Sequence, residues 1–247
     1  MTKISAVVIT KNEESNIKTC LESLLFCDEV IVVDDESIDK TRIIAEKYNT
    51  KVYINRLENF SSQRNFGLSK VNHEWVLFID ADEIVSNELK EEIVKKIDTL
   101  NINGFFIQRR DVFLGKKMQH GDLGKVSLMR LAKRNFKWVN DVHEVWEVTG
   151  KTSNLENPVI HNSHKNLSEF IEKIDQYSSL RAEELQKQKV FSSSFSIVFY
   201  PVGKFTNLFF IKLGFLDGLH GFVHAVFMSM YSFFVRGKLY QLNNERK

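Results

Sequence analysis

Cysteine and proline are scarce in this chain, which has only two of each among 247 residues. Cys20 and Cys27 lie in or near one expected helix without the spacing of metal ligands, so neither a disulfide framework nor a cysteine metal site is predicted. The first residues, MTKISAVVIT, also lack the basic and apolar regions of a secretory signal. These absences predict a protein of the reducing cytoplasm.

An excess of charge of one sign is missing as well. The formal net charge is only +2, which argues against nucleic acid as a partner, because binding a polyanion calls for a basic surface. The local pairs Arg109-Arg110 and Lys116-Lys117 are expected to be ordinary solvated positions.

Apolar runs alternate with helical patterns through the first part of the chain. Because the runs are apolar almost throughout, each strand should be covered on both faces, which is typical of a parallel sheet between helices. We predict an α/β fold with a Rossmann-like, mainly parallel sheet flanked by helices. The expected strands are Ile4–Ile9, Val30–Val33, Lys51–Ile54 and Glu74–Ile79, and the expected helices are residues 17–25, 40–48, 61–71 and 87–100.

The pattern changes after Asn103. Short strands are expected at Phe105–Gln108, Val126–Arg130 and Val145–Val148 without full helices between them, which favours a mixed or antiparallel extension of the sheet. A helical period returns from Ser168 to Lys187.

The most informative segment is EWVLFIDADE, residues 74–83. Side chains at i and i+2 of an extended chain point the same way, so Asp80 and Asp82 can face one ligand. Paired carboxylates suit a hard cation such as Mg²⁺ or Mn²⁺, which commonly takes its other ligands from substrate phosphates. The segment therefore predicts a nucleotide-diphosphate site.

Two further polar clusters follow predicted strands, at residues 10–13 (TKNE) and 34–37 (DDES). Ligands of an open parallel sheet collect at the carboxyl ends of its strands, so all three clusters should share one edge. The rival interpretation of residues 34–37 is a capping turn, with Ser37 capping the next helix.

The motifs AVVITKNEE, VVDDESIDKT, SSQRNFGLSK and WVLFIDADE resemble the nucleotide-sugar half of family 2 glycosyltransferases of GT-A fold. KVSLMRLAKRNFKWVNDVHEVWE, PVIHNSH and GFLDGLHGF resemble the subgroup that builds lipopolysaccharide core. The resemblance implies a metal-dependent, inverting transfer of a hexose, with glucose as first choice, from a UDP-sugar to a hydroxyl of a lipopolysaccharide-core or lipid-linked acceptor. It also implies a catalytic domain at 1–165, with a nucleotide-sugar half (1–100) and an acceptor half (101–165), and a C-terminal helical region at 166–247.

The resemblance also assigns roles to individual residues. Arg64 contacts the nucleotide or is an exposed helix residue, Asp80 contacts the ribose or the metal shell, and Asp82 ligates the cation. The uridine would be held by Thr10, Asn12, Glu13 and either Asp34 or Asp35.

The base that deprotonates the acceptor is expected in WVNDVHEVW, residues 138–146. Glu144 matches the family's HE element and is favoured, with Asp141 as the runner-up. His161 is a candidate third metal ligand, because imidazole tolerates Mn²⁺. The alternative for His161 is a polar loop position.

Phenylalanine is concentrated in the C-terminal region, where eleven of the twenty lie between Phe191 and Phe234. Residues 218–235 carry no charge, but two histidines and two serines make the stretch a poor membrane span. We expect a segment in the membrane interface or a contact between copies in a homo-oligomer. The first option predicts a peripheral protein on the cytoplasmic face of the inner membrane.

Two other functions are weighed against a transferase. A nucleotidyltransferase of similar fold would need a glycine-rich phosphate loop after the first strand, and TKNEE has no glycine. A non-catalytic membrane-associated adaptor would be expected to lose the metal acids, yet Asp80, Asp82 and Glu144 are all present.

Overall fold

A computed structural model describes residues 2–98, 101–124, 126–140, 144–164 and 167–244. The chain divides into two compact units. Residues 1–109 and 126–161 form the first, called the sheet unit here, and residues 110–125 and 162–247 form the second, called the helical unit. The helical unit therefore includes a segment from the middle of the chain. The functional division at residue 165 stays a prediction.

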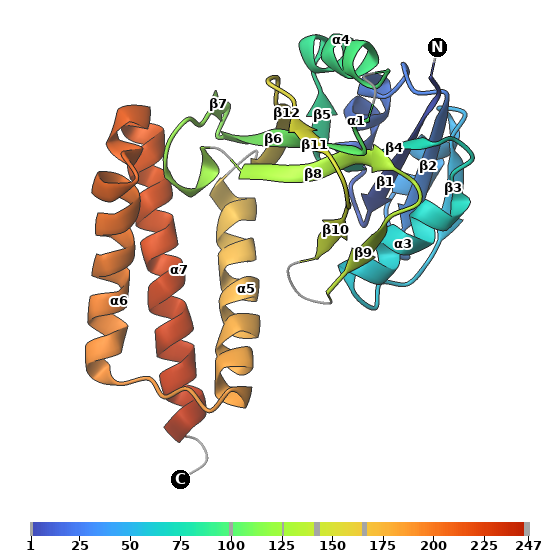
Figure 1. The fold of residues 1–247 in the computed structure, drawn as a ribbon. Helices are drawn as coiled ribbons and strands as arrows, with labels where there is room; N and C mark the ends of the chain where they lie inside the picture. Colours follow the sequence, from blue (N-terminus) through green and yellow to red (C-terminus); the bar gives the residue numbers. More distant parts are fainter. Residues whose placement is uncertain (1, 99–100, 125, 141–143, 165–166, 245–247) are drawn as a thin grey trace. The chain divides into compact units, whose positions relative to one another are not determined.

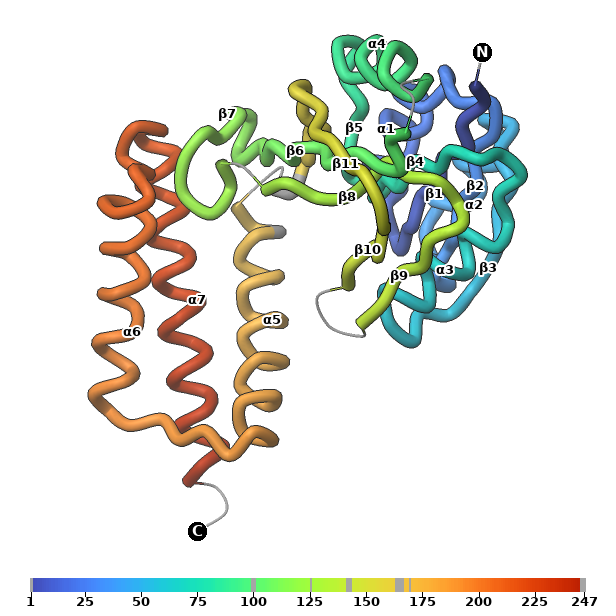
Figure 2. Tube along the Cα trace, viewed as in Figure 1, coloured from blue at the N-terminus to red at the C-terminus, as the bar shows by residue number. Residues whose placement is uncertain are grey.

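The sheet unit alternates strands and helices along its first hundred residues, as Figures 1 and 2 show. Its helices are α1 (Ile17–Ser23), α2 (Thr41–Glu46), α3 (Phe60–Lys70) and α4 (Asn87–Lys96). Its strands are β1 (Ile4–Thr10), β2 (Glu29–Asp34), β3 (Lys51–Ile54), β4 (Trp75–Asp80), β5 (Glu83–Val85), β6 (Gly104–Phe113), β8 (Val126–Lys133), β9 (Lys137–Val139), β10 (Val145–Glu147), β11 (Thr152–Asn154) and β12 (Val159–His164), with β6 and β12 continuing into the helical unit.

The main sheet has the strand order β3-β2-β1-β4-β8-β6-β12-β5. Strands β3, β2, β1 and β4 are parallel, whereas β8 is antiparallel to both β4 and β6. The predicted parallel sheet with a mixed extension is confirmed. Strands β9 and β10 form a separate antiparallel hairpin, called the β9–β10 hairpin below.

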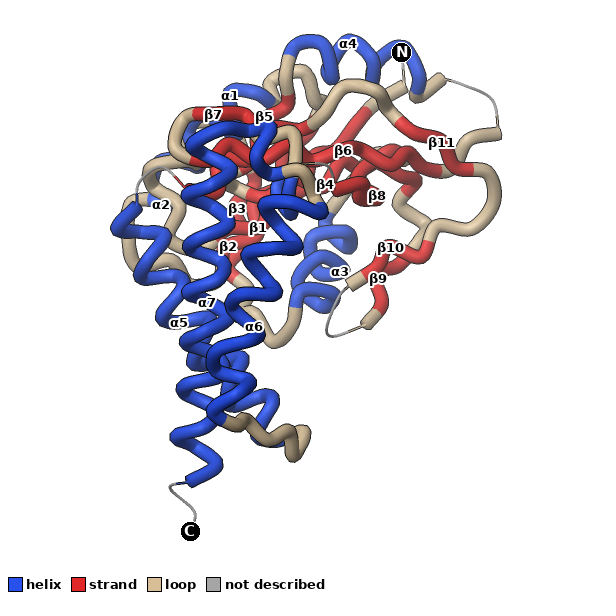
Figure 3. Tube along the Cα trace, turned by 90° about the vertical axis from the view of Figure 1, so that its left-hand side faces the viewer, coloured by secondary structure: helices blue, strands red, loops and turns tan. Residues whose placement is uncertain are grey.

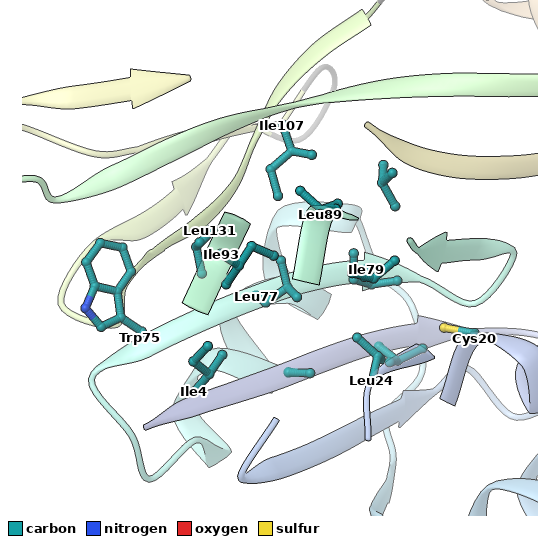
Figure 4. Packing of buried hydrophobic residues seen from close by; sticks show 14 of the residues in the cluster. Ile4, Cys20, Leu24, Trp75, Leu77, Ile79, Leu89, Ile93, Ile107 and Leu131 are labelled. Atoms are coloured by element: carbon teal, nitrogen blue, oxygen red, sulfur yellow. The ribbon is translucent and has the colours of Figure 1, made fainter. Parts of the chain in front are cut away.

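Both faces of the sheet are buried because its strands alternate between two apolar clusters. One cluster joins Ile4, Leu77 and Ile79 of the sheet to α1 and α4, through Leu24, Leu89 and others (Figure 4). The other joins Val7, Val33 and Phe78 to α3 and the β9–β10 hairpin. A Cβ at Gly67 of α3 would lie only 2.5 Å from Val7 Cγ1, so the glycine sets how closely this helix approaches β1.

The helical unit contains three long helical segments, visible in blue in Figure 3. Helix α7 packs against both α5 and α6, with Phe170 and Ile174 of α5 in one apolar cluster and Ala182 and Leu185 in another. Its elements are β7 (Lys116–Lys117), the short helix η1 (Gly121–Leu123), α5 (Leu167–Lys187), α6 (Ser194–Thr206), the π-helical η2 (Asn207–Ile211), η3 (Gly214–Asp217) and α7 (Gly218–Asn244).

The buried Asp217 ties residues 116–120 to the start of α7. Its carboxylate accepts the backbone N–H groups of Gln119 and His120, and its carbonyl oxygen accepts a hydrogen bond from Lys116. The segment carrying β7 and η1 therefore belongs with the C-terminal helices, although it lies far from them in sequence.

Candidate active site

Asp80 ends β4 and is held by two arginines. Its Oδ2 accepts a hydrogen bond from Arg130 at 2.7 Å, and its Oδ1 accepts one from Arg64 at 3.1 Å. Burial alone would raise the pKa of Asp80, but the charges of Arg130 and Arg64 outweigh it and hold the pKa far below its usual range. Asp80 is therefore an ionised carboxylate whose two oxygens are both engaged.

The buried acid Glu83 contacts both Asp80 and Arg130. Its side chain is fully buried, its Oε2 accepts the Asp80 N–H at 2.9 Å, and its Oε1 lies 3.0 Å from Arg130. Burial raises the pKa of Glu83, and the neighbouring negative charge of Asp80 adds to the rise. The guanidinium of Arg130 therefore forms ion pairs with both Asp80 and Glu83.

Asp82 has a different partner from Asp80. Its Oδ2 lies 3.0 Å from Nε2 of His161, and both side chains are partly exposed. The contact exists because β12 pairs with β5 in antiparallel register, which sets His161 opposite Glu83. The structure therefore brings together the two candidate ligands Asp82 and His161, while Asp80 faces the arginines.

Glu144 contacts the same arginine as Asp80. Its Oε1 is 3.5 Å from the same Nη2 atom of Arg64 that contacts Asp80. Glu144 directly precedes β10, so the β9–β10 hairpin carries it to the site. The alternative base, Asp141, lies outside the described residues.

Helix α3 delivers Arg64 as a buried residue, so it is not the exposed helix position considered from sequence. The helix begins with a capping box between Asn59 and Ser62, which fixes its first turn. Arg64 is only 4% exposed, and its guanidinium lies over the Trp138 ring at 4.7 Å. Its Nε and Nη1 atoms have no hydrogen-bond partner among the residues that the structure describes.

The first predicted uridine cluster follows β1 and is tied to the cluster after β2. The backbone N–H of Asn12 donates to Ser37 Oγ at 2.8 Å, and Asn12 Oδ1 accepts the Ile38 N–H. Glu13 binds Asn16 through its carboxylate at the start of α1. The buried Thr10 hydroxyl has no partner within the described part of the chain.

Asp34 and Asp35 end β2 in different environments. Asp34 is fully buried, and one carboxylate oxygen accepts the Ser37 N–H at 2.8 Å. Burial would raise the pKa of Asp35, but hydrogen bonds from Lys11, at 2.7 Å, and from the Leu57 N–H lower it. Both carboxylates lie next to the loop after β1, as the strand order requires.

The prediction that Ser37 caps the next helix is wrong. Helix α2 begins at Thr41, and its N-cap position is Lys40, which makes no side-chain cap. Ser37 instead accepts the Asn12 N–H described above. Its hydroxyl therefore joins two loops at one edge of the sheet.

A cavity of about 210 Å³ adjoins the acids. Arg64, Arg130 and Glu144 line it together with the aromatic residues Phe106, Trp138 and Trp146. The stacked rings of Trp138 and Trp146 also pack on Phe78. Both tryptophans are therefore core residues that also form a wall of the cavity.

Arg130 is the site residue that sequence reasoning missed, and Glu83 was recognised only as a member of the cluster after β4, without a role of its own. A signal for Arg130 was present, because it is the single charge inside the apolar run LMRLA of β8. A charged side chain that is 3% exposed needs a counter-ion. Which acid supplies it depends on the pairing of β8 with β4.

The arrangement combines three chemical capacities near the carboxyl end of β4. A carboxylate and an imidazole are adjacent at Asp82 and His161, Glu144 is a second accessible carboxylate, and Arg64 links Glu144 to Asp80. Such a site can hold a cation and remove a proton close by. Among the described residues, no group of three or more His, Cys, Asp or Glu forms a metal site by itself.

Comparisons with known proteins agree on one family. The model of the family "Glycosyl transferase family 2" matches residues 5–146. An uncharacterized glycosyltransferase of Rickettsia typhi is 30% identical over 98% of this chain and 88% of its own length. The lipopolysaccharide core biosynthesis glycosyltransferase LpsC of Rhizobium meliloti is 27% identical over 96% of this chain and 92% of its own.

A solved structure shares the fold. Residues 1–349 of Staphylococcus aureus TarS, crystallised with UDP-GlcNAc, align with a TM-score of 0.50 at 15% identity. The alignment covers 100% of this chain and 93% of that one. The GT-A fold expected from the sequence is confirmed.

Proposed function

The chain belongs to glycosyl transferase family 2, and from this premise we propose that it moves a hexose from a UDP-sugar to an acceptor hydroxyl with inversion and with the help of a divalent cation. Glucose is the first donor to test. The acceptor is a lipopolysaccharide-core or lipid-linked glycan, which the likeness to LpsC supports.

One observation carries the proposal, the position of Arg64 between two acids. The same guanidinium nitrogen lies 3.1 Å from Asp80 and 3.5 Å from Glu144. Asp80 belongs to the segment expected at the donor diphosphate, and Glu144 is the candidate base. Their common neighbour supports a site in which leaving group and acceptor meet within a few ångströms.

The residues present fit a divalent cation at Asp82 and His161. A carboxylate oxygen and an imidazole nitrogen 3.0 Å apart suit Mn²⁺ or Mg²⁺. Two protein ligands leave positions for phosphate oxygens, as is usual for a cation that binds with a nucleotide. When bound, the cation supplies positive charge to the departing diphosphate.

The chain's own groups would perform the remaining steps. The loops after β1 and β2, with Thr10, Asn12, Glu13, Asp34 and Asp35, would bind the uridine. The Glu144 carboxylate would accept the proton of the acceptor hydroxyl as the hydroxyl oxygen attacks the anomeric carbon and the bond from that carbon to the departing UDP breaks. Arg64 would hold Glu144 in place, and the aromatic wall of the cavity would exclude water.

The proposed setting is the cytoplasmic side of a membrane. A UDP-sugar donor is a cytoplasmic metabolite class, and a lipid-linked acceptor would bring the reaction to the inner membrane. The likeness to LpsC supports this setting.

The first test measures nucleotide release from UDP-, GDP- and dTDP-sugars with Mn²⁺ or Mg²⁺, and again with a chelator. We expect UDP release from a UDP-hexose, and we expect the chelator to abolish it. Glu144→Gln should lower the rate at least 100-fold, because general-base catalysis contributes about 10²–10⁴ in rate. UDP binding, followed by calorimetry, should be unchanged.

Glu147→Gln is the matched control, since Glu147 is an exposed carboxylate of the same hairpin. It should keep the wild-type rate. Turnover of a GDP- or dTDP-sugar alone would exclude the uridine assignment. Full activity of Glu144→Gln would exclude Glu144 as the base.

A further inference from the structure

Helix α6 has an unusual surface for a protein in water. None of its residues is buried, and its large apolar side chains Phe195, Val198 and Phe199 are 76%, 58% and 64% exposed. Its only charged residue is Lys204, which pairs with Asp122. A helix without a polar face is normally covered by protein or lipid.

The exposed apolar surface continues beyond α6. Phe191 precedes the helix, Ile211 and Leu216 follow it, and Leu219 and Phe233 belong to α7. We call the exposed apolar side chains of residues 191–233 the apolar surface. Many large apolar side chains exposed on two packed helices are typical of a binding site for protein or membrane.

The apolar surface is not the hidden side of an ordinary core helix. Two segments, Ser194–Ile211 and Gly214–Asn244, are long and apolar enough to cross a membrane. In the most apolar part of each segment, however, only 11% and 22% are buried within the protein. Core helices of soluble proteins pass the same composition test while being mostly buried. These segments therefore need a covering that the described chain does not supply.

A membrane-spanning arrangement conflicts with α5. This helix packs along α7, which lies between α5 and α6 (Figures 1 and 2). It exposes charges along its whole length, among them Glu172, Lys173, Arg181 and Glu184. Charges at the centre of a bilayer are costly, so α5 is not expected to cross a membrane beside its partner α7.

Charge favours a lipid surface over a second copy of the chain. The helical unit has 15 lysines and arginines against 9 aspartates and glutamates, whereas the sheet unit has 19 against 23. Two positively charged helical units repel each other, but anionic head groups attract them. The uncharged residues 218–235 of α7 lie between the buried Asp217 and Arg236, and Lys212 precedes Asp217.

We propose that the apolar surface docks the helical unit into one leaflet of an anionic membrane, with α6 lying in the interface and α5 in water. The benefit of such docking rests on the proposed function, because it would hold the enzyme beside a lipid-linked acceptor. The docking itself needs neither donor nor acceptor and can be measured alone.

The test is flotation of the purified full-length protein with vesicles of phosphatidylcholine alone or with 30% phosphatidylglycerol. We expect the protein to float with anionic vesicles and to bind more weakly at 0.5 M salt, because salt screens the attraction to head groups. Phe195→Gln/Phe199→Gln should weaken binding at least tenfold. The control Leu25→Gln/Ile43→Gln, which removes two exposed apolar side chains of the sheet unit, should bind like the wild type.

The depth of α6 in the membrane is measured from the quenching of tryptophan fluorescence by brominated lipids in the Phe195→Trp variant. The fluorescence of the wild-type protein is subtracted first. Quenching strongest with bromine near the head groups supports docking in the interface, while strongest quenching at the bilayer centre contradicts it. The proposal is also contradicted if the protein does not bind vesicles but forms dimers, and if the Phe195→Gln/Phe199→Gln variant is monomeric. The apolar surface would then join two copies of the chain. UDP release in solution should be the same for both double variants, so failure of docking and failure of the proposed reaction are separate results.

Discussion

At the scale of single residues, the site depends on two buried arginines that are shared between acids. Arg64 contacts Asp80 and Glu144, and Arg130 contacts Asp80 and Glu83. A buried ion pair contributes little net stability, but removing one partner is costly because the other charge remains without compensation. The acids of this site are therefore positioned by residues that need not touch a substrate.

Replacing Arg130 tests this sharing. Arg130→Leu should lower the free energy of unfolding by about 3–5 kcal/mol, since it leaves a buried carboxylate without its counter-ion. Adding Glu83→Gln should recover part of the loss, because the fully buried acid becomes neutral. Urea unfolding of the single and double variants measures both effects. A single variant within 1 kcal/mol of the wild type would contradict the assigned role.

At the scale of elements, α3 connects the two halves of the site. Arg64 faces the acids, while its neighbour Asn65 holds the β9–β10 hairpin through two hydrogen bonds to the Trp138 backbone, at 2.8 and 2.9 Å. Ser61 adds contacts to the carbonyl oxygens of Val139 and Asn140. The helix thereby fixes the hairpin that carries Glu144.

Asn65→Ala should loosen this hairpin. We expect stability to fall by about 1–3 kcal/mol, because two backbone groups lose their partner, and kcat to fall about tenfold with an unchanged KM for the donor. Asn65→Asp keeps the acceptor for the Trp138 N–H and should be intermediate. Ser69→Ala, which removes only a local bond within α3, is the control. A change confined to the donor KM would argue against positioning of Glu144.

At the scale of the whole molecule, stability should depend on pH through two partly buried acids. Burial would raise the pKa of Glu29, but hydrogen bonds from Lys51, Ser5 and Asn72 lower it from 4.5 to about 2. The stabilisation is therefore complete above pH 4.5 and is lost as the pH falls toward 2. Burial would likewise raise the pKa of Glu92 in α4, but hydrogen bonds from Lys96 and Asn157 lower it to about 2.

Glu29→Gln should flatten this acid dependence. At pH 7 the variant should lose about 1–3 kcal/mol, because hydrogen bonds to a charged group are replaced by weaker ones. Near pH 2 it should match the wild type, whose Glu29 is then partly protonated. Thermal or urea unfolding from pH 2 to 7 measures the difference. A constant difference across this range would show that ionisation of Glu29 does not contribute.

The strands and most of the helices were predictable because their signals are local. The apolar runs of β1, β2 and β4 and the helical period of α5 can be recognised without knowing what they contact. Strand β10 was expected as Val145–Val148, whereas β5 and β9 are too short for a clear period. The place of residues 116–120 beside the start of α7 depends on Asp217, about a hundred residues away, and no local pattern reveals it.

The sequence by itself determined the family, the parallel sheet and the three polar clusters at the edge of the sheet. Each of these features depends on short stretches of contiguous residues. Only the tertiary structure decided how the acids are shared. The pairing of β12 with β5 sets His161 beside Asp82, and β8 brings Arg130 to the DADE segment, leaving Asp80 to the arginines. The physical reason is that an ion pair depends on distance in space, and these partners are about fifty to eighty residues apart along the chain.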